Sequence, residues 1–293
     1  MNIKDKICLI SGANSGIGKA AAVELAKRGA HIIMLCRNEE KAEKAKEDIL
    51  RVCGHDKVDI VLADFSSLQQ VSEAADQINA TYPRIDVLNN NAGILMGDKR
   101  QLTEDGYEMT FQVNYLSHFL LTYKLIDKVF AAERGNIINV SSEAHRFASF
   151  DVNNLQSEKK YLGITAYANS KLLNVLFTHE LAKRLQGTHV VTNALHPGGI
   201  STGLYEGVSG VFGFLAKLTT PFMPSEEKGA RTTIHLATSE EGFTSNGQYF
   251  KSRKPATPSK AATNDYNARR LWEISEKMLN ISFKPEERAM SSR

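Results

Sequence analysis

Residues 7–18 read ICLISGANSGIG, an apolar run followed directly by a glycine-rich turn. Ile7 to Ile10 predicts a short strand, and Ser15 to Arg28 predicts a helix that Gly29 ends. The three glycines of the turn therefore lie between a strand and a helix. There, glycine permits a tight turn and lets backbone N–H groups approach a pyrophosphate at the helix N-terminus. A plain strand-to-helix turn is the alternative for so short a motif.

The rest of the chain repeats this alternation of strand and helix. Glu39 to Arg51 predicts a charged helix with Asn38 as its N-cap. Helical patterns also separate the further apolar runs that we predict as strands, which are His31 to Cys36, Val58 to Leu62, Val87 to Asn89, Asn136 to Val140 and Val190 to Leu195. Such alternation predicts the α/β class, with one Rossmann-type, doubly wound parallel sheet and helices on both faces. Residues 143–163 and 197–224 break the pattern after strand ends, where open α/β sheets bind ligands.

Composition argues against several classes of protein. The chain has 293 residues, of which 42% are hydrophobic and 24% charged, enough for one large core. A net charge of +3 without a Lys/Arg block argues against nucleic acid as a partner. No apolar run approaches the roughly 20 residues of a membrane span, and we expect no signal peptide. Cys8, Cys36 and Cys53 show no metal-ligand spacing, so we expect no metal site and a cytoplasmic protein.

The end of the second strand, MLCRN at residues 34–38, bears on the choice of nucleotide. An NAD site usually offers an acid there to the ribose 2′-hydroxyl. Here neutral Cys36 is followed by Arg37, whose guanidinium matches the oxygens of a 2′-phosphate. We therefore predict NADP(H) as the preferred cofactor, with NAD(H) as a possible substitute. The alternative is an Arg37 that only caps the strand edge.

A polar strip interrupts the apolar run ITAYANSKLLNVLF at residues 164–177. Tyr167, Lys171 and Asn174 fall about one helical turn apart on one face. A free phenol has a pKa of about 10, which is too high for easy proton exchange at neutral pH. A nearby cation favours the phenolate, and Lys171 is placed to supply that cation. Taken alone, the pattern also fits a core tyrosine beside a snorkelling lysine.

Together, the motifs of this chain resemble those of the short-chain dehydrogenase/reductase family. They follow the family order from residue 1 to about residue 250. The matching stretches are SGANSGIG (11–18), LAD (62–64), NNAG (90–93), VNYLSHF (113–119), INVSS (138–142), YANSK (167–171) and HPG (196–198). Ser11 stands where the family usually carries Thr, and Asn89 where it usually carries an apolar residue.

A closer resemblance is to the retinol dehydrogenase-like branch of that family. It rests on the stretches GANSGIGKAAA (12–22), MLCRNEEKAE (34–43), SSEAHRFASF (141–150) and YNARRLWEISEKML (266–279). The branch commonly reduces apolar aldehydes and ketones with NADPH. This implies an NADP-dependent oxidoreductase (EC 1.1.1.-) for a small apolar carbonyl or alcohol; the N-terminal membrane anchor of many members is not expected here. The other hypotheses are an NADP(H)-binding redox sensor and a scaffold, both without turnover.

The resemblance implies four catalytic residues. Tyr167 is the expected acid/base, and Lys171 both lowers its pKa and hydrogen-bonds the nicotinamide ribose. Ser142, rather than Ser141, is expected to orient the carbonyl oxygen while charge develops there. Asn114 matches the position whose backbone carbonyl holds a water near the lysine, and helix capping is its alternative role.

The same resemblance implies a set of residues that bind the cofactor. Asn91 is expected to steady the sheet, and Gly93 to allow close approach of the cofactor. Asp64 is expected near the adenine amino group, or alternatively as a cap of the helix beginning near Ser67. The full set is Gly12, Asn14, Ser15, Gly16, Ile17, Gly18, Arg37, Asp64, Phe65, Asn91, Ala92, Gly93, Tyr167, Lys171, Pro197, Gly198, Ile200 and Thr202.

We predict that residues 1–293 form a single domain. Its expected parts are a nucleotide-binding part over about 1–140, a catalytic and substrate part over about 141–250, and a C-terminal helix over about 263–280. Within the second part, GLYEGVSGVFGFLAKLTTPFMP (203–224) is apolar for a loop, and we predict a mobile lid over an apolar substrate. Contact with a membrane or with a second subunit is the alternative.

Two further expectations concern partners and histidines. Family helices around residues 118–132 and 166–185 often pair between subunits, so a homodimer is a further hypothesis. His145, His179 and His196 invite metal-site or catalytic-triad interpretations, but the sequence offers no partners at fitting spacing. We therefore expect packing or surface roles for them.

Overall fold

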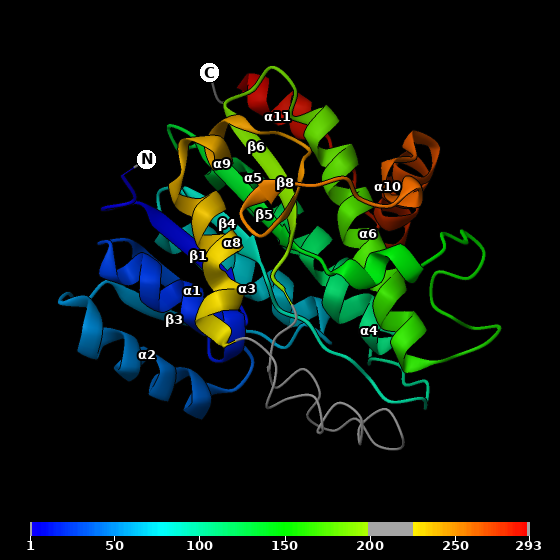
Figure 1. Ribbon diagram of the computed structural model, residues 1–293, viewed down its shortest axis with the longest axis horizontal. Coiled ribbons are helices and arrows are strands. Elements are labelled where there is room, and N and C mark those ends of the chain that lie inside the picture. Colours follow the sequence, from blue (N-terminus) through cyan, green and yellow to red (C-terminus); the bar gives the residue numbers. More distant parts are fainter. Residues whose placement is uncertain (1, 199–224, 292–293) are drawn as a thin grey trace.

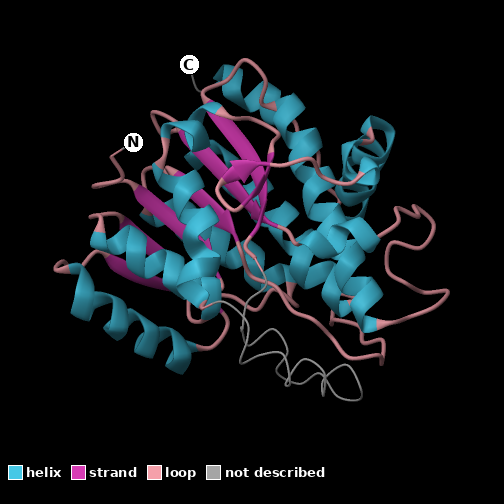
Figure 2. Cartoon of the chain, in the orientation of Figure 1, coloured by secondary structure: helices cyan, strands magenta, loops and turns pink. Residues whose placement is uncertain are grey.

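A computed structural model describes residues 2–198 and 225–291. Its sheet has eight strands in the order β3-β2-β1-β4-β5-β6-β7-β8, and all neighbours are parallel except β7 and β8. The strands are β1 (Ile7–Ser11), β2 (His31–Cys36), β3 (Val58–Leu62), β4 (Val87–Asn90), β5 (Gly135–Val140), β6 (Val190–His196), β7 (Tyr249–Lys251) and β8 (Lys254–Pro255). Figure 2 shows this sheet enclosed by helices, so the predicted Rossmann-type fold is confirmed.

Most helices fall between consecutive strands, as the alternating pattern predicts, and the last two follow β8. The α-helices are α1 (Gly16–Lys27), α2 (Glu39–Cys53), α3 (Leu68–Thr81), α4 (Met109–Phe111), α5 (Ser117–Phe130), α6 (Gly163–Arg184), α8 (Glu226–Thr238), α9 (Glu240–Thr244), α10 (Asp265–Leu279) and α11 (Pro285–Ser291). A π-helical turn, η1 (Gln112–Leu116), precedes α5, and 3₁₀ turns are η2 (Glu143–Phe147) and η5 (Lys260–Thr263).

Two hydrophobic cores lie on the two faces of the sheet. On one face, α1, α2, α8 and α9 bury small and branched side chains against residues such as Ile10 and Ile138. On the other face, α3, α5 and α6 bury larger side chains against residues such as Leu9 and Ile137. Figure 1 shows α8 beside α1 in front of the sheet, and these two helices pack against each other. The alternation of Leu9 and Ile10 between the cores follows from the two-residue period of a strand.

Several predicted boundaries are wrong by one or two residues. Ser15 takes an extended N-cap conformation, so α1 begins at Gly16 and not at Ser15. The second helix continues past Arg51 to Cys53, because Gly54 is the residue that adopts the left-handed conformation ending it (φ 75°). In the structure, each of the strands predicted at residues 7–10, 87–89, 136–140 and 190–195 is one residue longer than predicted. The predicted N-cap Asn38 is confirmed, since its side chain accepts a hydrogen bond from the Lys41 N–H at 2.8 Å.

The C-terminal helices pack on α5 and α6, the two helices that the homodimer hypothesis places between subunits. In Figure 1, α10 and α11 lie against α6 and α5, and the packing of both pairs is close. Trp272 of α10 stacks on Phe177 and Phe283, with ring centroids 5.9 and 4.8 Å apart. Phe119 packs edge-on against Trp272 at 4.9 Å. These rings are almost fully buried within one chain, and the homodimer stays a prediction.

Two sequence predictions meet the limits of the described segments. The predicted lid, residues 203–224, lies outside the described residues. In the part of the chain that the structure does describe, no helix combines the length and apolar character needed to cross a bilayer.

Candidate active site

A cavity of about 900 Å³ opens at the carboxyl ends of the parallel strands. It is lined by turns that follow β1, β2, β3, β4, β5 and β6 and by the first turns of α1 and α6. The predicted site residues on its wall are Gly12, Asn14, Ser15, Gly16, Ile17, Gly18, Arg37, Asp64, Phe65, Asn91, Ala92, Gly93, Ser142, Tyr167, Lys171, Pro197 and Gly198. Asn114 lies behind the wall, and Ile200 and Thr202 lie outside the described residues.

The glycine-rich turn after β1 forms an open cradle in this cavity. Gly12 and Gly16 have positive φ angles of 68° and 57°, which side-chain-bearing residues rarely adopt. A Cβ atom on Gly18 would lie 2.3 Å from the Gly12 carbonyl oxygen, so only glycine fits there. The Ser15 side chain makes no capping hydrogen bond, which leaves the first N–H groups of α1 for an anion. The turn therefore fits the pyrophosphate of a dinucleotide.

Ser11 joins this cradle to the turn after β4. Its Oγ accepts hydrogen bonds from the backbone N–H groups of Asn91 and Ala92, each at 2.9 Å. Asn91 Nδ2 donates to the Ser11 carbonyl oxygen at 2.8 Å. The hydroxyl that Ser11 shares with the family's usual Thr is thus the group that these bonds require. Asn89 is the other residue that departs from the family pattern. Its side-chain amide is buried without a described hydrogen-bond partner, and nothing in the structure explains an asparagine at this position.

His118 extends the Ser11 network, and sequence reasoning missed it. Its Nδ1 lies 3.2 Å from the Asn114 carbonyl oxygen and its Nε2 lies 3.0 Å from Ser11 Oγ. A carbonyl oxygen only accepts, so Nδ1 carries the proton and Nε2 accepts from the serine hydroxyl. Burial lowers the pKa of His118 to about 3 and keeps the ring neutral. A histidine one helical turn after Asn114 on an apolar helix was the available signal.

Two cations flank the end of β2. The Arg37 side chain lines the cavity, is 71% exposed, and has a guanidinium nitrogen 3.8 Å from Asp64 Oδ2. Lys41, in the first turn of α2, also lines the cavity and was not predicted. Burial raises the pKa of the Cys36 thiol to about 11, so this residue adds no negative charge. The end of β2 therefore presents two cations to the cavity, and Cys36 adds no negative charge there.

Asp64 does not cap α3, so the alternative prediction of a helix cap is wrong. The N-cap is Ser67, whose side chain accepts from the Gln70 N–H. Asp64 Oδ1 instead accepts hydrogen bonds from the N–H and Oγ of Ser66, both at 2.8 Å. This turn holds the Asp64 carboxylate at the cavity wall.

Tyr167 and Lys171 lie together on α6, nearly buried at the inner wall of the cavity. Lys171 Nζ is 5.6 Å from the centre of the Tyr167 ring and donates to the Val140 carbonyl oxygen at 3.1 Å. Asn174 Nδ2 donates to the same carbonyl at 3.2 Å. Burial lowers the pKa of Lys171 from 10.5 to about 8. The polar strip of this apolar helix therefore faces the end of β5 and the cavity.

Asn114 belongs to the π-helical turn that precedes α5, where such turns often mark functional sites. Its Oδ1 accepts from the Ile94 N–H at 2.7 Å, and its Nδ2 donates to the Ile94 carbonyl oxygen at 2.9 Å. Nδ2 also donates to Ser170 Oγ, which bonds to the Tyr167 carbonyl oxygen. The side chain is thus a bridge between the turn after β4 and the turn of α6 that carries Tyr167. It is not a helix cap.

The two serines after β5 differ in their surroundings. Ser141 is buried, and its Oγ donates to the Lys171 carbonyl oxygen at 2.7 Å, so it anchors α6. Ser142 lines the cavity, and its Oγ accepts from the Ala144 N–H at 3.2 Å. A hydroxyl that accepts there keeps its own proton free to donate into the cavity. The geometry favours Ser142 over Ser141 as a group that can contact a ligand.

The outer part of the cavity is largely apolar. Its wall there is formed by Ile94, Leu95, Met96, Met109, Val113 and Ile164. Gln101 and His196 are polar side chains on the same wall, and neither was predicted as part of the site. Because these residues come from separate turns and helices, no local pattern in the sequence brings them together.

The three histidines that invited catalytic interpretations make ordinary hydrogen bonds. His179 Nε2 lies 2.7 Å from Asp265 Oδ1 on the outer side of α6. His145 is buried, and His196 accepts from a backbone N–H. Within residues 2–198 and 225–291, no group of three or more His, Cys, Asp or Glu side chains could hold a metal ion.

Comparisons with known proteins show the family to which this chain belongs. A family model described as short chain dehydrogenase matches residues 6–209. Human retinol dehydrogenase 12 is 39% identical over 96% of this chain and 88% of its own, and human retinol dehydrogenase 13 is 41% identical over 95% and 86%. A solved structure from Mycobacterium paratuberculosis has a TM-score of 0.77 at 30% identity, with 96% of each chain covered. A short chain dehydrogenase from Escherichia coli CFT073, solved in complex with NADPH, has a TM-score of 0.69 at 25% identity, with 86% of this chain and 98% of that chain covered.

Proposed function

We propose a function for this chain from one premise: it belongs to the short chain dehydrogenase family. Members of this family are oxidoreductases that use NAD(P)(H) on alcohols and carbonyls, and this chain is one of them. Beyond that, we propose that it reduces an apolar aldehyde or ketone with NADPH, or oxidises the corresponding alcohol with NADP⁺. The carrying observation is that Ser142, Tyr167 and Lys171 line one cavity with the glycine cradle and Arg37.

In this proposal Tyr167 and Lys171 of α6, together with Ser142 after β5, transfer one proton and stabilise one oxygen atom. When bound, the nicotinamide supplies the hydride that goes to the carbonyl carbon. The Tyr167 hydroxyl gives its proton to the carbonyl oxygen, so that an alcohol forms. Ser142 donates a hydrogen bond to that oxygen, where negative charge develops. Lys171, whose ammonium lies 5.6 Å from the Tyr167 ring, stabilises the tyrosinate left behind.

Preference for NADP(H) is supported by the charges at the end of β2. Arg37 and Lys41 both line the cavity, and Cys36 stays a neutral thiol. A 2′-phosphate would gain charge-assisted hydrogen bonds from the two cations. NAD(H) has only a hydroxyl at this position and would lose these contacts.

Preference for an apolar substrate is supported by the outer wall of the cavity. Aliphatic and thioether side chains, such as Leu95, Met96 and Ile164, form that wall. Each buried CH₂ group contributes about 0.8 kcal/mol, which corresponds to about fourfold in kcat/KM until the cavity is full. We therefore expect kcat/KM to increase with chain length along a series of straight-chain aldehydes. Glyceraldehyde is the polar control for the straight-chain aldehyde of similar size. Equal use of the polar and apolar aldehydes would contradict this part of the proposal.

The deciding experiment compares the native chain with Tyr167→Phe on a panel of carbonyls and alcohols, with both nucleotides. The native chain should oxidise NADPH with at least one apolar carbonyl. The Phe variant keeps the ring but lacks the proton donor, so it should bind NADPH normally and turn over at least about 10²-fold more slowly. Tight NADPH binding by the native chain without turnover of any carbonyl or alcohol would instead support the redox sensor.

We also propose a cytoplasmic location and retain the homodimer as a hypothesis. The first is supported by three free thiols, at Cys8, Cys36 and Cys53, which suit a reducing compartment. Sedimentation of the purified chain at micromolar concentration tests the second.

A further inference from the structure

The peptide group that links Ser142 to Glu143 is contacted on both sides by a histidine. Its carbonyl oxygen lies 2.6 Å from Nδ1 of His145. Its N–H donates to Nδ1 of His196 at 3.3 Å. The two histidines come from different places in the chain, His145 from η2 and His196 from the end of β6. One peptide plane thus contacts two imidazole rings, and its carbonyl oxygen also accepts the backbone N–H of His145 at 3.1 Å.

These contacts fix opposite tautomers on the two rings. The Ser142 carbonyl only accepts, so His145 carries its proton on Nδ1. Nε2 of His145 accepts from the Ser259 N–H at 3.0 Å, which leaves that nitrogen without a proton. The Glu143 N–H only donates, so Nδ1 of His196 is unprotonated and a neutral ring has its proton on Nε2. Burial lowers the pKa of both rings, that of His196 to about 4, so both are neutral at pH 7.

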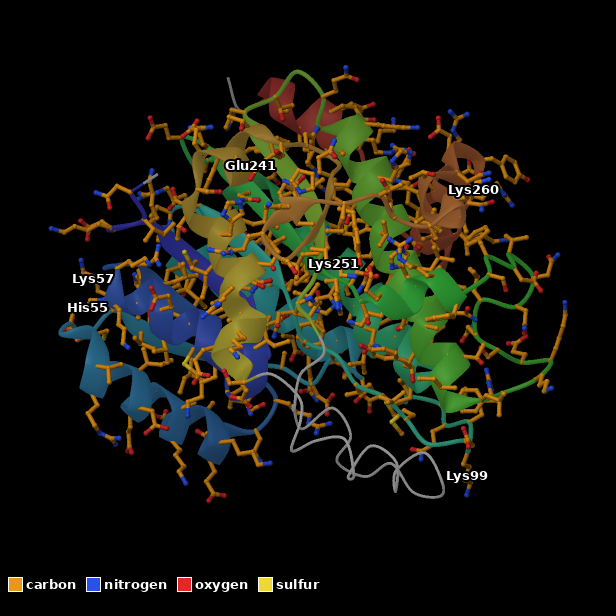
Figure 3. The ribbon with its side chains drawn as sticks, viewed as in Figure 1. His55, Lys57, Lys99, Glu241, Lys251 and Lys260 are labelled. Atoms are coloured by element: carbon orange, nitrogen blue, oxygen red, sulfur yellow. The ribbon has the colours of Figure 1, made fainter. Side chains whose placement is uncertain are left out.

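The residues beside this peptide are held by residues 249–259, which include β7, the neighbour of β6 in the sheet. Glu143 accepts from the Tyr249 hydroxyl at 3.0 Å and from Lys251 Nζ at 2.9 Å. Figure 3 labels Lys251 near the centre of the view and Lys99 near its lower edge. Ser259, which contacts His145, belongs to the same C-terminal segment. Residues 249–259 therefore define where the peptide after Ser142 lies.

We propose that His145 and His196 are positioning residues that together fix the orientation of Ser142 in the cavity. This inference rests on the proposed function, because it concerns the serine that would contact the carbonyl oxygen. A peptide plane whose C=O and N–H groups are both hydrogen-bonded cannot rotate about the axis that joins its two Cα atoms. The Ser142 Cα is therefore fixed, and the hydroxyl stays on the cavity wall where Tyr167 also lies. His145 acts in this account only through the backbone, and His196, which also lies on the cavity wall, acts through its Nδ1 contact with the Glu143 N–H.

Asparagine and leucine variants test the proposal, because the two side chains have similar size and only asparagine can replace the Nδ1 contact. Asn at 145 offers an N–H to the Ser142 carbonyl, and Asn at 196 offers an oxygen to the Glu143 N–H. We expect kcat for a good aldehyde to fall at least tenfold in His145→Leu and His196→Leu. His145→Asn and His196→Asn should stay within about threefold of the native kcat. The dissociation constant for NADPH, measured by fluorescence titration, should not change in any of the four.

His189 supplies the matched control for a lost imidazole contact. Its Nε2 lies 2.9 Å from the Phe130 carbonyl oxygen at the opposite end of β6. His189→Leu should leave kcat within about twofold, and circular dichroism confirms that each variant is folded. Leu variants with native kcat, or Asn variants that lose as much as the Leu variants, would overturn the inference. A native chain without activity would instead overturn the proposed function. Amide exchange at residues 142–143 then tests the inference by itself. Equal protection of these residues in the native chain and in the Leu variants would overturn the inference as well.

Discussion

Replacement of Lys171 by methionine should make the free protein more stable while it abolishes turnover. The side chain is 4% exposed, and burial lowers its pKa from 10.5 to about 8. This difference corresponds to ~3 kcal/mol that folding loses at pH 7 by burying a charged ammonium. Methionine fills a similar volume without charge. The Val140 carbonyl keeps its second donor, Asn174 Nδ2, so little is lost in return. We expect a gain of about 1–3 kcal/mol at pH 7.

The pH dependence of this gain has a defined sign. The folded pKa of Lys171 lies below the unfolded one, so between about pH 8 and 10.5 the unfolded chain binds more protons. The stability of the native chain relative to Lys171→Met therefore rises with pH across that window. The advantage of the variant should be full at pH 7 and small at pH 10.

Urea unfolding without nucleotide, followed by tryptophan fluorescence at both pH values, measures the effect. Trp272 is the single tryptophan and lies against α6, so it reports on the relevant core. A variant less stable than the native chain at pH 7, or an advantage that is equal at pH 7 and pH 10, would refute the reasoning. Lys44→Met on the exposed side of α2 is the control and should change stability by less than about 0.5 kcal/mol.

Three further predictions concern the nucleotide and the C-terminal helices. Arg37→Ala should weaken NADPH binding by about 1–2 kcal/mol, a modest loss because solvent partly screens the exposed guanidinium. NADH binding should not change in parallel titrations, and equal losses for both nucleotides would show that Arg37 does not contact the 2′-phosphate. Gly18→Ala places a methyl group 2.3 Å from a carbonyl oxygen of the cradle, so dinucleotide affinity should drop at least tenfold for both nucleotides. Trp272→Ala should cost about 3–5 kcal/mol in thermal or chemical unfolding because it empties a fully buried site. A loss below about 1 kcal/mol would mean that α10 is only loosely attached.

Features that depend on neighbouring residues were predictable from the sequence. The apolar runs and the glycine turn indicated the parallel sheet, because strand and helix periods are local properties of the chain. The Tyr167–Lys171 pair was equally visible, because a spacing of four places both side chains on one helical face. The shared cavity wall of these two residues and the glycine cradle then followed from the strand order.

Features that depend on contacts between distant segments were not predictable. His118 bonds to Ser11 across 107 positions, and His145 meets Ser259 across 114. Neither separation leaves a periodic trace in the sequence. The short strand β7 and the helix α11 were missed for a related reason, since only packing on β6 and α5 defines them. The one- and two-residue boundary errors came from cap geometry, as at Ser15 and Gly54.

The aromatic contacts of α10 and α11 have a consequence for the synthesis of the protein. Translation proceeds from the N-terminus, so the residues that cover Phe119 and Phe177 are among the last to leave the ribosome. Until Trp272 and Phe283 emerge, the nascent chain carries an uncovered aromatic face on α5 and α6. Such a face is a binding site for a chaperone. A premature stop codon shortly before residue 265 would make that exposure permanent, and the truncated product would be a target for proteolysis even though its cavity-lining residues were all present.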